Sequence, residues 1–358
     1  MKNGSNQQNA KPILITGGAG FIGTNLTHRL ASQGRKVRIL DNLSRAGVEK
    51  NLQWLLEQHS ESLEFQEGDI RDASAVKQAV SGTEMVFHLA AQVAVTTSLI
   101  APIEDFEVNA RGTINVLEAI RNQTRPPSLI YTSTNKVYGS LDDLPLSETK
   151  KRYIKKGRPN CAISEQRGLD FHSPYGCSKG AAEQYVRDFA RSYGLKTVVF
   201  RMSCIFGPHQ CGNEDQGWVA HFLIRALHHD LIVLYGKGKQ IRDLLFIDDL
   251  VDAFLVAAEK MDALSGHAFN IGGGERNTLS LLELLDIIEE LDGRPPKFTF
   301  GRVREGDQRY YVSDTRLFSE LTGWKPRVPA LEGVRRLHKW LIDNEVELDH
   351  SLLRSVAA

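Results

Sequence analysis

A glycine-rich turn between two apolar strands is the feature that most constrains the fold of this 358-residue chain. Residues 13–16, "ILIT", form an apolar and mostly β-branched run, which is typical of a buried parallel strand. Gly17, Gly20 and Gly23 follow with the spacing G-x-x-G-x-x-G, and a helical pattern comes next. The segment "KVRIL" then predicts a second strand, which Asp41 ends. Strand, loop, helix, strand and acid in this order predict a Rossmann βαβ unit.

Each part of this unit suits the binding of a dinucleotide. Glycines let the backbone turn tightly and approach a pyrophosphate, and the N-terminus of the helix then faces the negative charge. Asp41 is placed to accept hydrogen bonds from the adenosine ribose, which favours NAD over NADP. Arg45 is close enough in sequence to hold a 2′-phosphate instead, so this preference is not absolute.

Strand-like and helical segments keep alternating through the first half of the chain. Further strands are predicted to end near residues 69–70, 90–91 and 132, and a sixth is predicted within "TVVFRMSCIFGP", with helical segments between them. This alternation predicts an α/β fold of the Rossmann type, with a doubly wound parallel sheet. Ligands of such sheets bind beyond the carboxyl ends of the strands.

The stretch "DFHSPYGCSK" places Tyr175 four residues before Lys179. Residues 178–192 predict a helix, and positions four apart share one helix face. A lysine cation and the positive nicotinamide of NAD⁺ both favour a phenolate, which would make the tyrosine a general base. Thr134 could hydrogen-bond the same substrate hydroxyl. A Y-x-x-x-K pair also occurs by chance on amphipathic helices, but here it follows a dinucleotide fingerprint.

Composition excludes several other classes of function. The formal net charge is +0 and no basic stripe is present, so we expect neither nucleic acid nor a membrane surface as partner. No apolar run approaches the roughly 18 residues of a membrane helix. The four cysteines form no CxxC pair, which predicts reduced thiols, no metal site and a cytoplasmic protein. Residues 1–10 are polar and predict a disordered tail.

Four stretches carry a resemblance to a known family: "TGGAGFIG", "HLAAQ", "STNKVYG" and "SPYGCSK". In their order and spacing they resemble the extended short-chain dehydrogenase/reductases, which act on nucleotide sugars, and the resemblance covers nearly the whole chain. It implies an NAD-binding Rossmann domain at 11–201, to which 240–268 returns. It also implies a smaller C-terminal α/β domain at 202–350 that binds the nucleotide sugar.

The resemblance also implies the site residues. The catalytic triad maps onto Thr134, Tyr175 and Lys179, and Lys179 would also hold the nicotinamide ribose. The residues expected to bind NAD are Gly17, Gly20, Phe21, Ile22, Gly23, Asp41, Asn42, Ser44, Arg45, Asp69, Ile70, Leu89, Ala90, Ala91, Gln92, Tyr175 and Lys179. Those expected to bind substrate are Thr97, Thr134, Asn135, Lys136, Gln216, Arg242 and Arg304.

The two arginines of this set would contact the pyrophosphate, because a planar guanidinium matches phosphate oxygens. Either could instead form a surface salt bridge. Many members of the family carry an asparagine at the position of Cys204, and that asparagine commonly contacts the diphosphate. We do not carry its role over to the thiol.

The type of reaction follows from the residues after the catalytic threonine. A 4,6-dehydratase needs acidic side chains there, and this chain has Asn135 and Lys136, which argues for an epimerase. The stretches "DNLSRAGVEKNLQWL", "AAQVAVTTS" and "EDQGWV" look like those of CDP-tyvelose (CDP-paratose) 2-epimerases. This implies inversion at C2 through a transient 2-keto sugar.

Two alternatives stay open. A UDP-sugar 4-epimerase, of the UDP-glucose or UDP-glucuronate type, would use the same machinery, and a non-catalytic NAD sensor would use the same fold. Relatives form homodimers or homotetramers, and segments 107–122 and 178–192 are the candidate surfaces for such contacts.

Three local features complete the expectations. His88 lies inside an apolar strand and predicts a hydrogen-bonded core histidine. Residues 235–246, "YGKGKQIRDLLF", predict a glycine-rich hairpin followed by a strand. Ser280 and Glu283 have the spacing of a helix capping box.

Overall fold

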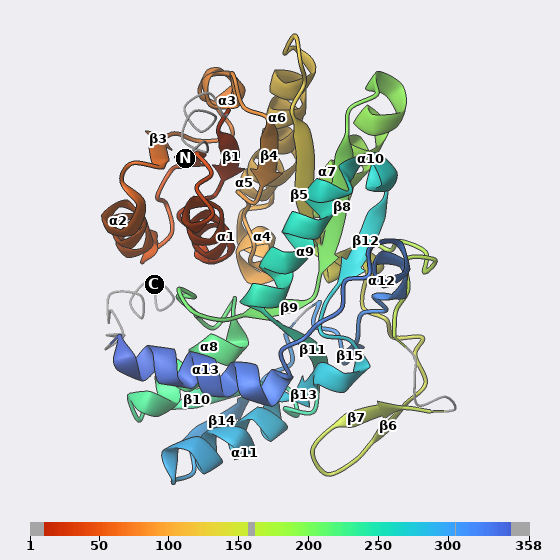
Figure 1. The fold of residues 1–358 in the computed structure, drawn as a ribbon. Helices are drawn as coiled ribbons and strands as arrows, with labels where there is room; N and C mark the ends of the chain where they lie inside the picture. Colours follow the sequence, from red (N-terminus) through yellow and green to blue (C-terminus); the bar gives the residue numbers. More distant parts are fainter. Residues whose placement is uncertain (1–10, 157–161, 305, 345–358) are drawn as a thin grey trace.

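A sheet of seven parallel strands forms the centre of the upper part of the molecule (Figure 1). The computed structural model describes residues 11–156, 162–304 and 306–344, so the expected tail at 1–10 and the region after 344 lie outside it. In spatial order the strands are β12 (Ala268–Ile271), β8 (Thr197–Met202), β5 (Ser128–Thr134), β4 (Met85–His88), β1 (Ile13–Thr16), β2 (Val37–Asp41) and β3 (Leu63–Glu67). The order reverses direction between β1 and β4, as in a doubly wound sheet. The predicted Rossmann-type fold is confirmed.

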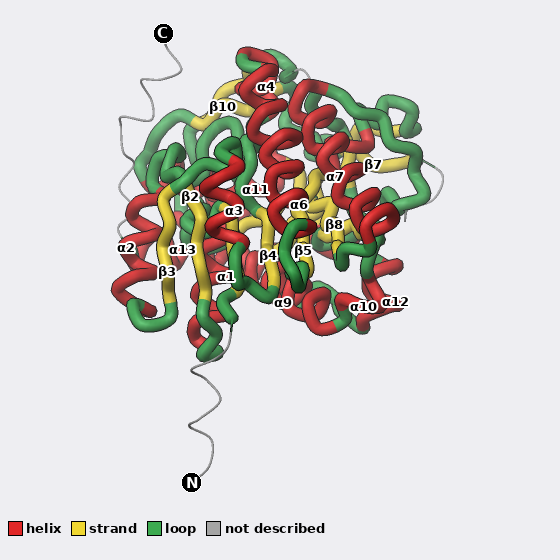
Figure 2. The backbone as a smooth tube through the Cα atoms, turned by 90° about the horizontal axis from the view of Figure 1, so that it is seen from above, coloured by secondary structure: helices red, strands yellow, loops and turns green. Residues whose placement is uncertain are grey.

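Helices cover both faces of this sheet (Figure 2). One face carries α1 (Phe21–Ser32), α2 (Val48–His59) and α9 (Ile247–Glu259), and the other carries α3 (Ala73–Val80), α6 (Gly112–Arg121) and α7 (Ser173–Tyr193). Alternation along the strands supplies both cores. In β1, Ile13 and Ile15 belong to the cluster of the first face, whereas Leu14 belongs to that of the second.

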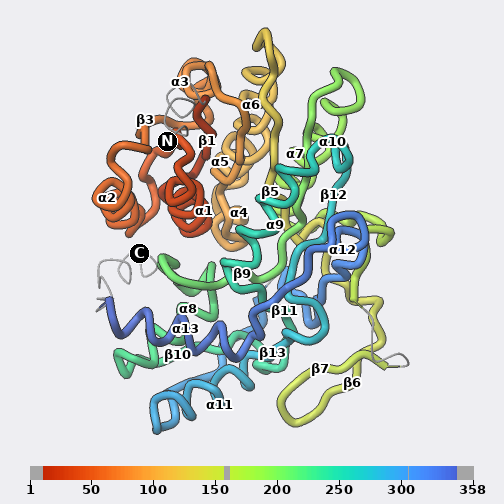
Figure 3. Tube along the Cα trace, viewed as in Figure 1, coloured from red at the N-terminus to blue at the C-terminus, as the bar shows by residue number. Residues whose placement is uncertain are grey.

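A second, smaller group of strands and helices lies below the large sheet in the view of Figure 3. Its main sheet consists of β9 (Cys204–Phe206), β11 (Ile241–Phe246), β13 (Thr278–Ser280) and β15 (Tyr310–Tyr311). Around it are α8 (Trp218–Leu227), α11 (Leu281–Asp292) and α13 (Ala330–Asp343), a parallel pair of β10 (Ile232–Tyr235) and β14 (Phe298–Gly301), and an antiparallel pair of β6 (Leu146–Glu148) and β7 (Tyr153–Lys155).

The expected hairpin at 235–246 is wrong. β10 pairs with β14, and β11 pairs with β9, β13 and β15, so the two strands on either side of the loop belong to different sheets. Gly236 and Gly238 both have positive φ and turn the chain as their type suggests. A turn signal fixes the local bend of the backbone but not the partner of the strand that follows.

The chain returns to the large sheet after β11. Helix α9 packs against α1, and β12 forms an edge strand of the large sheet beside β8. The division of the chain into two domains at about residue 201 stays a prediction.

Two helix starts are defined by their side chains. Helix α11 begins with the predicted capping box: Ser280 Oγ accepts from Glu283 N at 3.1 Å, and Glu283 Oε2 accepts from Ser280 N at 2.8 Å. Helix α7 begins at Ser173, earlier than the expected residue 178, because Pro174 is tolerated in the first turn. Tyr175 and Lys179 therefore both lie in the first two turns of α7. Among the described helices, none has the length and apolarity that crossing a bilayer requires.

Candidate functional site

A cleft of about 740 Å³ lies at the carboxyl ends of the large sheet and extends to the smaller sheet. All residues that the sequence analysis assigned to NAD or to substrate line this cleft. The structure therefore brings together side chains that lie far apart in the sequence, from Gly17 to Arg304. What each of them binds is a separate question, which the local geometry addresses.

The glycine-rich loop forms one wall of the cleft without room for side chains. Gly17 has φ +71°, and a Cβ there would lie 2.7 Å from the backbone nitrogen of Ala90. A Cβ on Gly23 would overlap the carbonyl oxygen of Gly17. Helix α1 begins directly after the loop, and its Gly20 N-cap offers no side-chain cap, so the first amides of the helix face the cleft unshielded by a capping side chain. Such a cradle fits a pyrophosphate.

Asp41 is held rigidly at the end of β2. Its Oδ2 accepts from Ala19 N at 3.1 Å and its Oδ1 from Leu43 N at 3.0 Å. Burial raises the pKa of Asp41, while these backbone hydrogen bonds lower it. A carboxylate has about four lone-pair sites, so the group can still accept from ribose hydroxyls. The loop and this acid together fit NAD.

The next strand end carries a second carboxylate. Asp69 accepts from Asn42 Nδ2 at 2.8 Å and from Arg71, and the hydrogen bond with Arg71 lowers the pKa of Asp69 to about 2. Gln92 also lines the cleft, but its side-chain amide is hydrogen-bonded to the backbone of Ala94. That bond shapes the loop after β4.

Thr134, Tyr175 and Lys179 meet at the middle of the cleft. Burial raises the pKa of Tyr175 to about 12, although a hydrogen bond with Thr134 lowers it. Burial likewise lowers the pKa of Lys179 to about 7, against the opposing effects of Asp105 and Glu183. The Lys179 ammonium lies 4.3 Å from the centre of the Tyr131 ring.

These shifts refine the expected acid–base chemistry. The sequence analysis expected Lys179 and a positive nicotinamide together to favour the phenolate of Tyr175. The protein groups alone favour the neutral phenol, because the hydroxyl is buried. Ionisation of Tyr175 therefore depends on charge that a bound ligand brings.

His88 is the hydrogen-bonded core histidine that the sequence predicted. Its Nδ1 lies 2.7 Å from Thr16 Oγ1 and its Nε2 lies 3.0 Å from Thr113 Oγ1. Burial, assisted by the charge of Lys179, lowers the pKa of His88 to about 3. The ring stays neutral and links strands β1 and β4 to helix α6.

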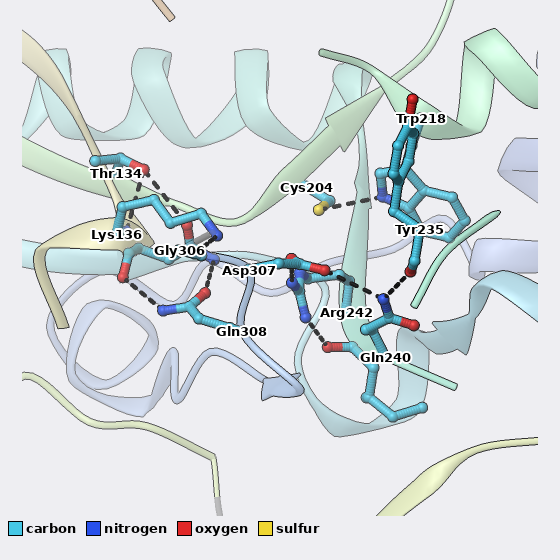
Figure 4. A network of polar contacts seen from close by, with 12 residues as sticks. Thr134, Lys136, Cys204, Trp218, Tyr235, Gln240, Arg242, Gly306, Asp307 and Gln308 are labelled. Carbon is cyan, nitrogen blue, oxygen red and sulfur yellow. Dashed lines mark hydrogen bonds and ion pairs between the residues drawn. The ribbon is translucent and has the colours of Figure 1, made fainter. Parts of the chain in front are cut away.

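A polar network closes the other end of the cleft (Figure 4). The amide of Lys136 donates to Thr134 Oγ1 at 3.2 Å, and the Lys136 ammonium donates to the carbonyl of Gly306 at 3.2 Å. The neighbouring Asp307 accepts from a terminal nitrogen of Arg242 at 2.5 Å. One loop thus contacts both the segment that follows β5 and strand β11.

The two predicted phosphate-binding arginines have different surroundings. Arg242 is buried, with 7% of its surface exposed, so its ion pair is not a surface contact. Arg304 lies 3.7 Å from the centre of the Tyr235 ring and donates to the carbonyl of Glu214 at 2.6 Å. It also forms an ion pair with Asp215 at 3.4 Å.

Comparison with known proteins decides the family. The model of the NAD dependent epimerase/dehydratase family matches residues 13–272.

The chain belongs to this family.

Three relatives illustrate the range of similarity. The CDP-paratose 2-epimerase of Salmonella typhi is 44% identical over 335 residues, which are 92% of this chain and 98% of that protein. The UDP-glucose 4-epimerase of Thermotoga maritima, solved with UDP-glucose, has a TM-score of 0.79 and 31% identity, covering 93% of this chain and 99% of its own. DesIV of Streptomyces venezuelae, a dTDP-glucose 4,6-dehydratase solved with NAD and TYD, has a TM-score of 0.81 and 26% identity, covering 93% and 98%. The family is NAD-dependent, in agreement with the glycine cradle and Asp41.

Some lining residues of this epimerase/dehydratase cleft were not predicted from the sequence. Trp218 donates from Nε1 to Cys204 Sγ at 3.5 Å, and Gln240 donates to Asp307 at 3.2 Å. Tyr235 supplies the ring beneath Arg304. They come from the start of α8, the end of β10 and the loop before β11. The stretches "EDQGWV" and "YGKGKQIRDLLF" contain Trp218, Tyr235 and Gln240, but their patterns gave no sign that these side chains line a cleft.

Proposed function

We propose that the chain is an NAD-dependent epimerase that inverts C2 of a nucleotide-diphosphate sugar, converting CDP-paratose to CDP-tyvelose or acting on a close analogue. The observation that carries this proposal is the 44% identity to a CDP-paratose 2-epimerase over almost the full length of both proteins. The compared 4-epimerase is more distant, at 31% identity. The alternative of a UDP-sugar 4-epimerase is therefore weaker.

Side chains at the middle of the cleft would perform the proton transfers. Tyr175 takes the proton of the C2 hydroxyl, Thr134 orients that hydroxyl, and Lys179 binds the nicotinamide ribose. The glycine loop and Asp41 would hold NAD, which would supply a hydride acceptor and donor at C2. The configuration inverts because the keto sugar turns in the cleft between the two transfers. Tyr175 then gives its proton back to the oxygen, so the reaction leaves enzyme and cofactor unchanged.

The residues after Thr134 support an epimerase over a dehydratase. Asn135 hydrogen-bonds with the side chain of Gln308, and Lys136 with Gly306. Neither side chain is a carboxylic acid, so neither can supply the acid and base that elimination of water requires. The keto sugar instead remains intact until its carbonyl is reduced.

We also propose that two copies of the chain associate through segments 107–122 and 178–192. Near them, α4 (Val95–Ile100) and α5 (Pro102–Phe106) expose large apolar side chains: Ile100 is 86% and Ile103 78% exposed. On α7, Tyr185 and Tyr193 are about half exposed. Sedimentation that shows only a monomer at micromolar concentration would refute the association.

Proton NMR of the purified protein with CDP-paratose, run beside UDP-glucose and UDP-glucuronic acid, tests the proposed reaction. The coupling between H1 and H2 reports inversion at C2, and the coupling between H3 and H4 reports inversion at C4. We expect a new C2 epimer from the CDP sugar and no change in the UDP sugars. Change only at C4 of a UDP sugar would establish the alternative. NAD binding without turnover of any of the three sugars would refute both and favour an NAD sensor.

A further inference from the structure

Lys136 follows Thr134 by two residues and lines the cleft with a partly buried side chain. It lies in the short 3₁₀ helix η2 (Asn135–Tyr138), which directly follows β5, and its amide donates to Thr134. Its ammonium donates to the carbonyl of Gly306, a neutral acceptor. Among the described residues, no carboxylate lies within ion-pair distance of the Lys136 nitrogen. An anion that enters the cleft would therefore stabilise this cation further.

The surroundings of Lys136 indicate where that anion would lie. Burial and the charge of Arg242 lower the pKa of Lys136 to about 8, whereas Asp307 and Cys204 act in the opposite direction. Lys136 and Arg242 bind neighbouring residues of one loop, Gly306 and Asp307, so the two cations lie near each other at the cleft (Figure 4). Two cations around one space match a diphosphate.

Cys204 is a weak competitor for the role of phosphate ligand at this site. Burial raises the pKa of its thiol, which keeps it neutral, and Sγ already accepts a hydrogen bond from Trp218 at 3.5 Å. A neutral thiol is a poor donor to a phosphate oxygen. Of the two cations at this part of the cleft, Lys136 and Arg242, Lys136 lies nearer to Thr134 in the chain, two residues after it.

We propose that Lys136 binds the phosphate that carries the sugar, and that it thereby selects C2 over C4 as the reacting carbon. The inference rests on the proposed function and adds a specificity-determining residue to it. C2 is separated from the phosphorus only by the anomeric carbon and its oxygen, whereas C4 lies across the ring. Reaction at C2 requires the phosphate to lie close to Thr134 and Tyr175, and Lys136 provides a cation there.

A purely structural role for Lys136, as a tie to the loop at Gly306, makes a different prediction. A glutamine at this position keeps a neutral donor for the Gly306 carbonyl but removes the charge. Lys136→Gln therefore separates the two roles. Lys237→Gln is the matched control, because Lys237 lies in the same half of the molecule with 63% of its side chain exposed and pairs with Glu148.

The test is calorimetric binding of CDP and of CMP to the NAD-containing enzyme. We expect Lys136→Gln to weaken CDP binding at least about tenfold, since charge-assisted bonds to phosphate are strong, and to leave CMP binding within about twofold. Lys237→Gln should change neither. Unchanged CDP affinity in Lys136→Gln, or equal weakening of CDP and CMP, would overturn the proposal, and intact CMP binding verifies that the variant is folded.

The selection of C2 has its own readout. Borodeuteride reduces keto sugars as they form, and NMR then locates the deuterium on the recovered sugar. With CDP-paratose we expect label at C2 in the wild-type enzyme and an increased share at C4 in Lys136→Gln. Label confined to C2 in a variant with weakened CDP binding would contradict the role in selecting the carbon.

These outcomes are distinguishable from failure of the proposed function. If the wild-type protein binds UDP in preference to CDP and inverts C4, the substrate proposal fails. The comparison of UDP with UMP in Lys136→Gln then still tests whether Lys136 binds the sugar-side phosphate. If the wild-type protein inverts C2 of CDP-paratose but Lys136→Gln binds CDP normally, only the inference about Lys136 fails.

Discussion

The large sheet and the smaller sheet contribute to one cleft but are built in different ways. In the large sheet, β1, β2 and β3 follow each other in sequence and in space, with one helix between each pair. In the smaller sheet, β9, β11, β13 and β15 come from segments that other elements separate. The first arrangement follows from local patterns, whereas the second depends on long-range pairing.

The two halves also form their walls with different chemistry. The half at the large sheet uses glycines, backbone amides and a carboxylate fixed by two amides. The half at the smaller sheet uses cations that the protein pairs with its own acids, such as Arg242 with Asp307. We expect substitutions in the first half to act through fit to the cofactor and those in the second through charge.

Tyr175→Phe should have the largest effect, because the two halves meet at this residue. Removing the hydroxyl leaves the ring packing but removes the proposed general base, and a general base typically contributes about 1000-fold to the rate. Epimer formation followed by NMR measures the loss. Tyr153→Phe, in β7 and outside the residues that line the cleft, is the control and should retain full activity. Near-normal turnover of Tyr175→Phe would exclude the proposed mechanism.

Gly23→Ala tests how closely the half at the large sheet fits the proposed cofactor. The added Cβ would overlap the carbonyl of Gly17, and such overpacking typically costs about 1–3 kcal/mol. We expect the NAD content of the purified protein, measured by release and absorbance, to fall about tenfold or more. Gly168→Ala is the matched control, because no atom lies within 4 Å of a Cβ built there. Equal NAD content in both variants would mean that the loop does not approach the cofactor.

The same contrast explains which features the sequence could predict. The strands of the large sheet, the glycine loop, Asp41 and the Tyr175–Lys179 pair lie in contiguous patterns whose geometry is local. The pairing of β10 with β14 could not be predicted, because about sixty residues separate them and the glycine-rich loop after β10 resembles a hairpin turn.

The side of the cleft opposite the large sheet was equally hard to predict from the sequence. Trp218, at the start of α8, and Gln240, just before β11, both line the cleft, and residues that lie far apart in the sequence surround them there. The raised pKa of Tyr175 could not be predicted either, since burial depends on the whole fold.

Arg242→Met tests the charge of the substrate half. It removes a buried cation and leaves Asp307 without that partner, so a diphosphate meets a negative charge in place of a positive one. We expect the KM for the nucleotide sugar to rise about tenfold or more while the NAD content stays normal. Arg309→Met is the control, because Arg309 pairs with Asp142 at the surface with half of its side chain exposed. If Arg242→Met lowered the NAD content and left KM unchanged, the two halves would not have the separate roles proposed here.

His88→Gln should have the smallest effect of these substitutions, and we expect it on the pH dependence of stability. It tests the electrostatic contrast between the two halves. Where the smaller sheet keeps its groups charged by pairing them, the large sheet keeps His88 neutral between two threonine hydroxyls. The pKa of His88 is about 3 in the folded protein, against about 6.5 when it is unfolded. Between these values the unfolded chain binds the extra proton, so the free energy of unfolding falls as the pH is lowered from 6.5 toward 3.

Urea unfolding at a series of pH values, with NAD in excess, measures this contribution. Glutamine cannot titrate, so His88→Gln should be less stable than the wild type near pH 7 but should lose stability less steeply toward pH 4. Parallel slopes for His88→Gln and the wild type would mean that the ring accepts a proton inside the folded sheet. The half at the large sheet would then tolerate a buried charge without a partner. The electrostatic contrast with the half at the smaller sheet, where Arg242 is paired with Asp307, would not hold.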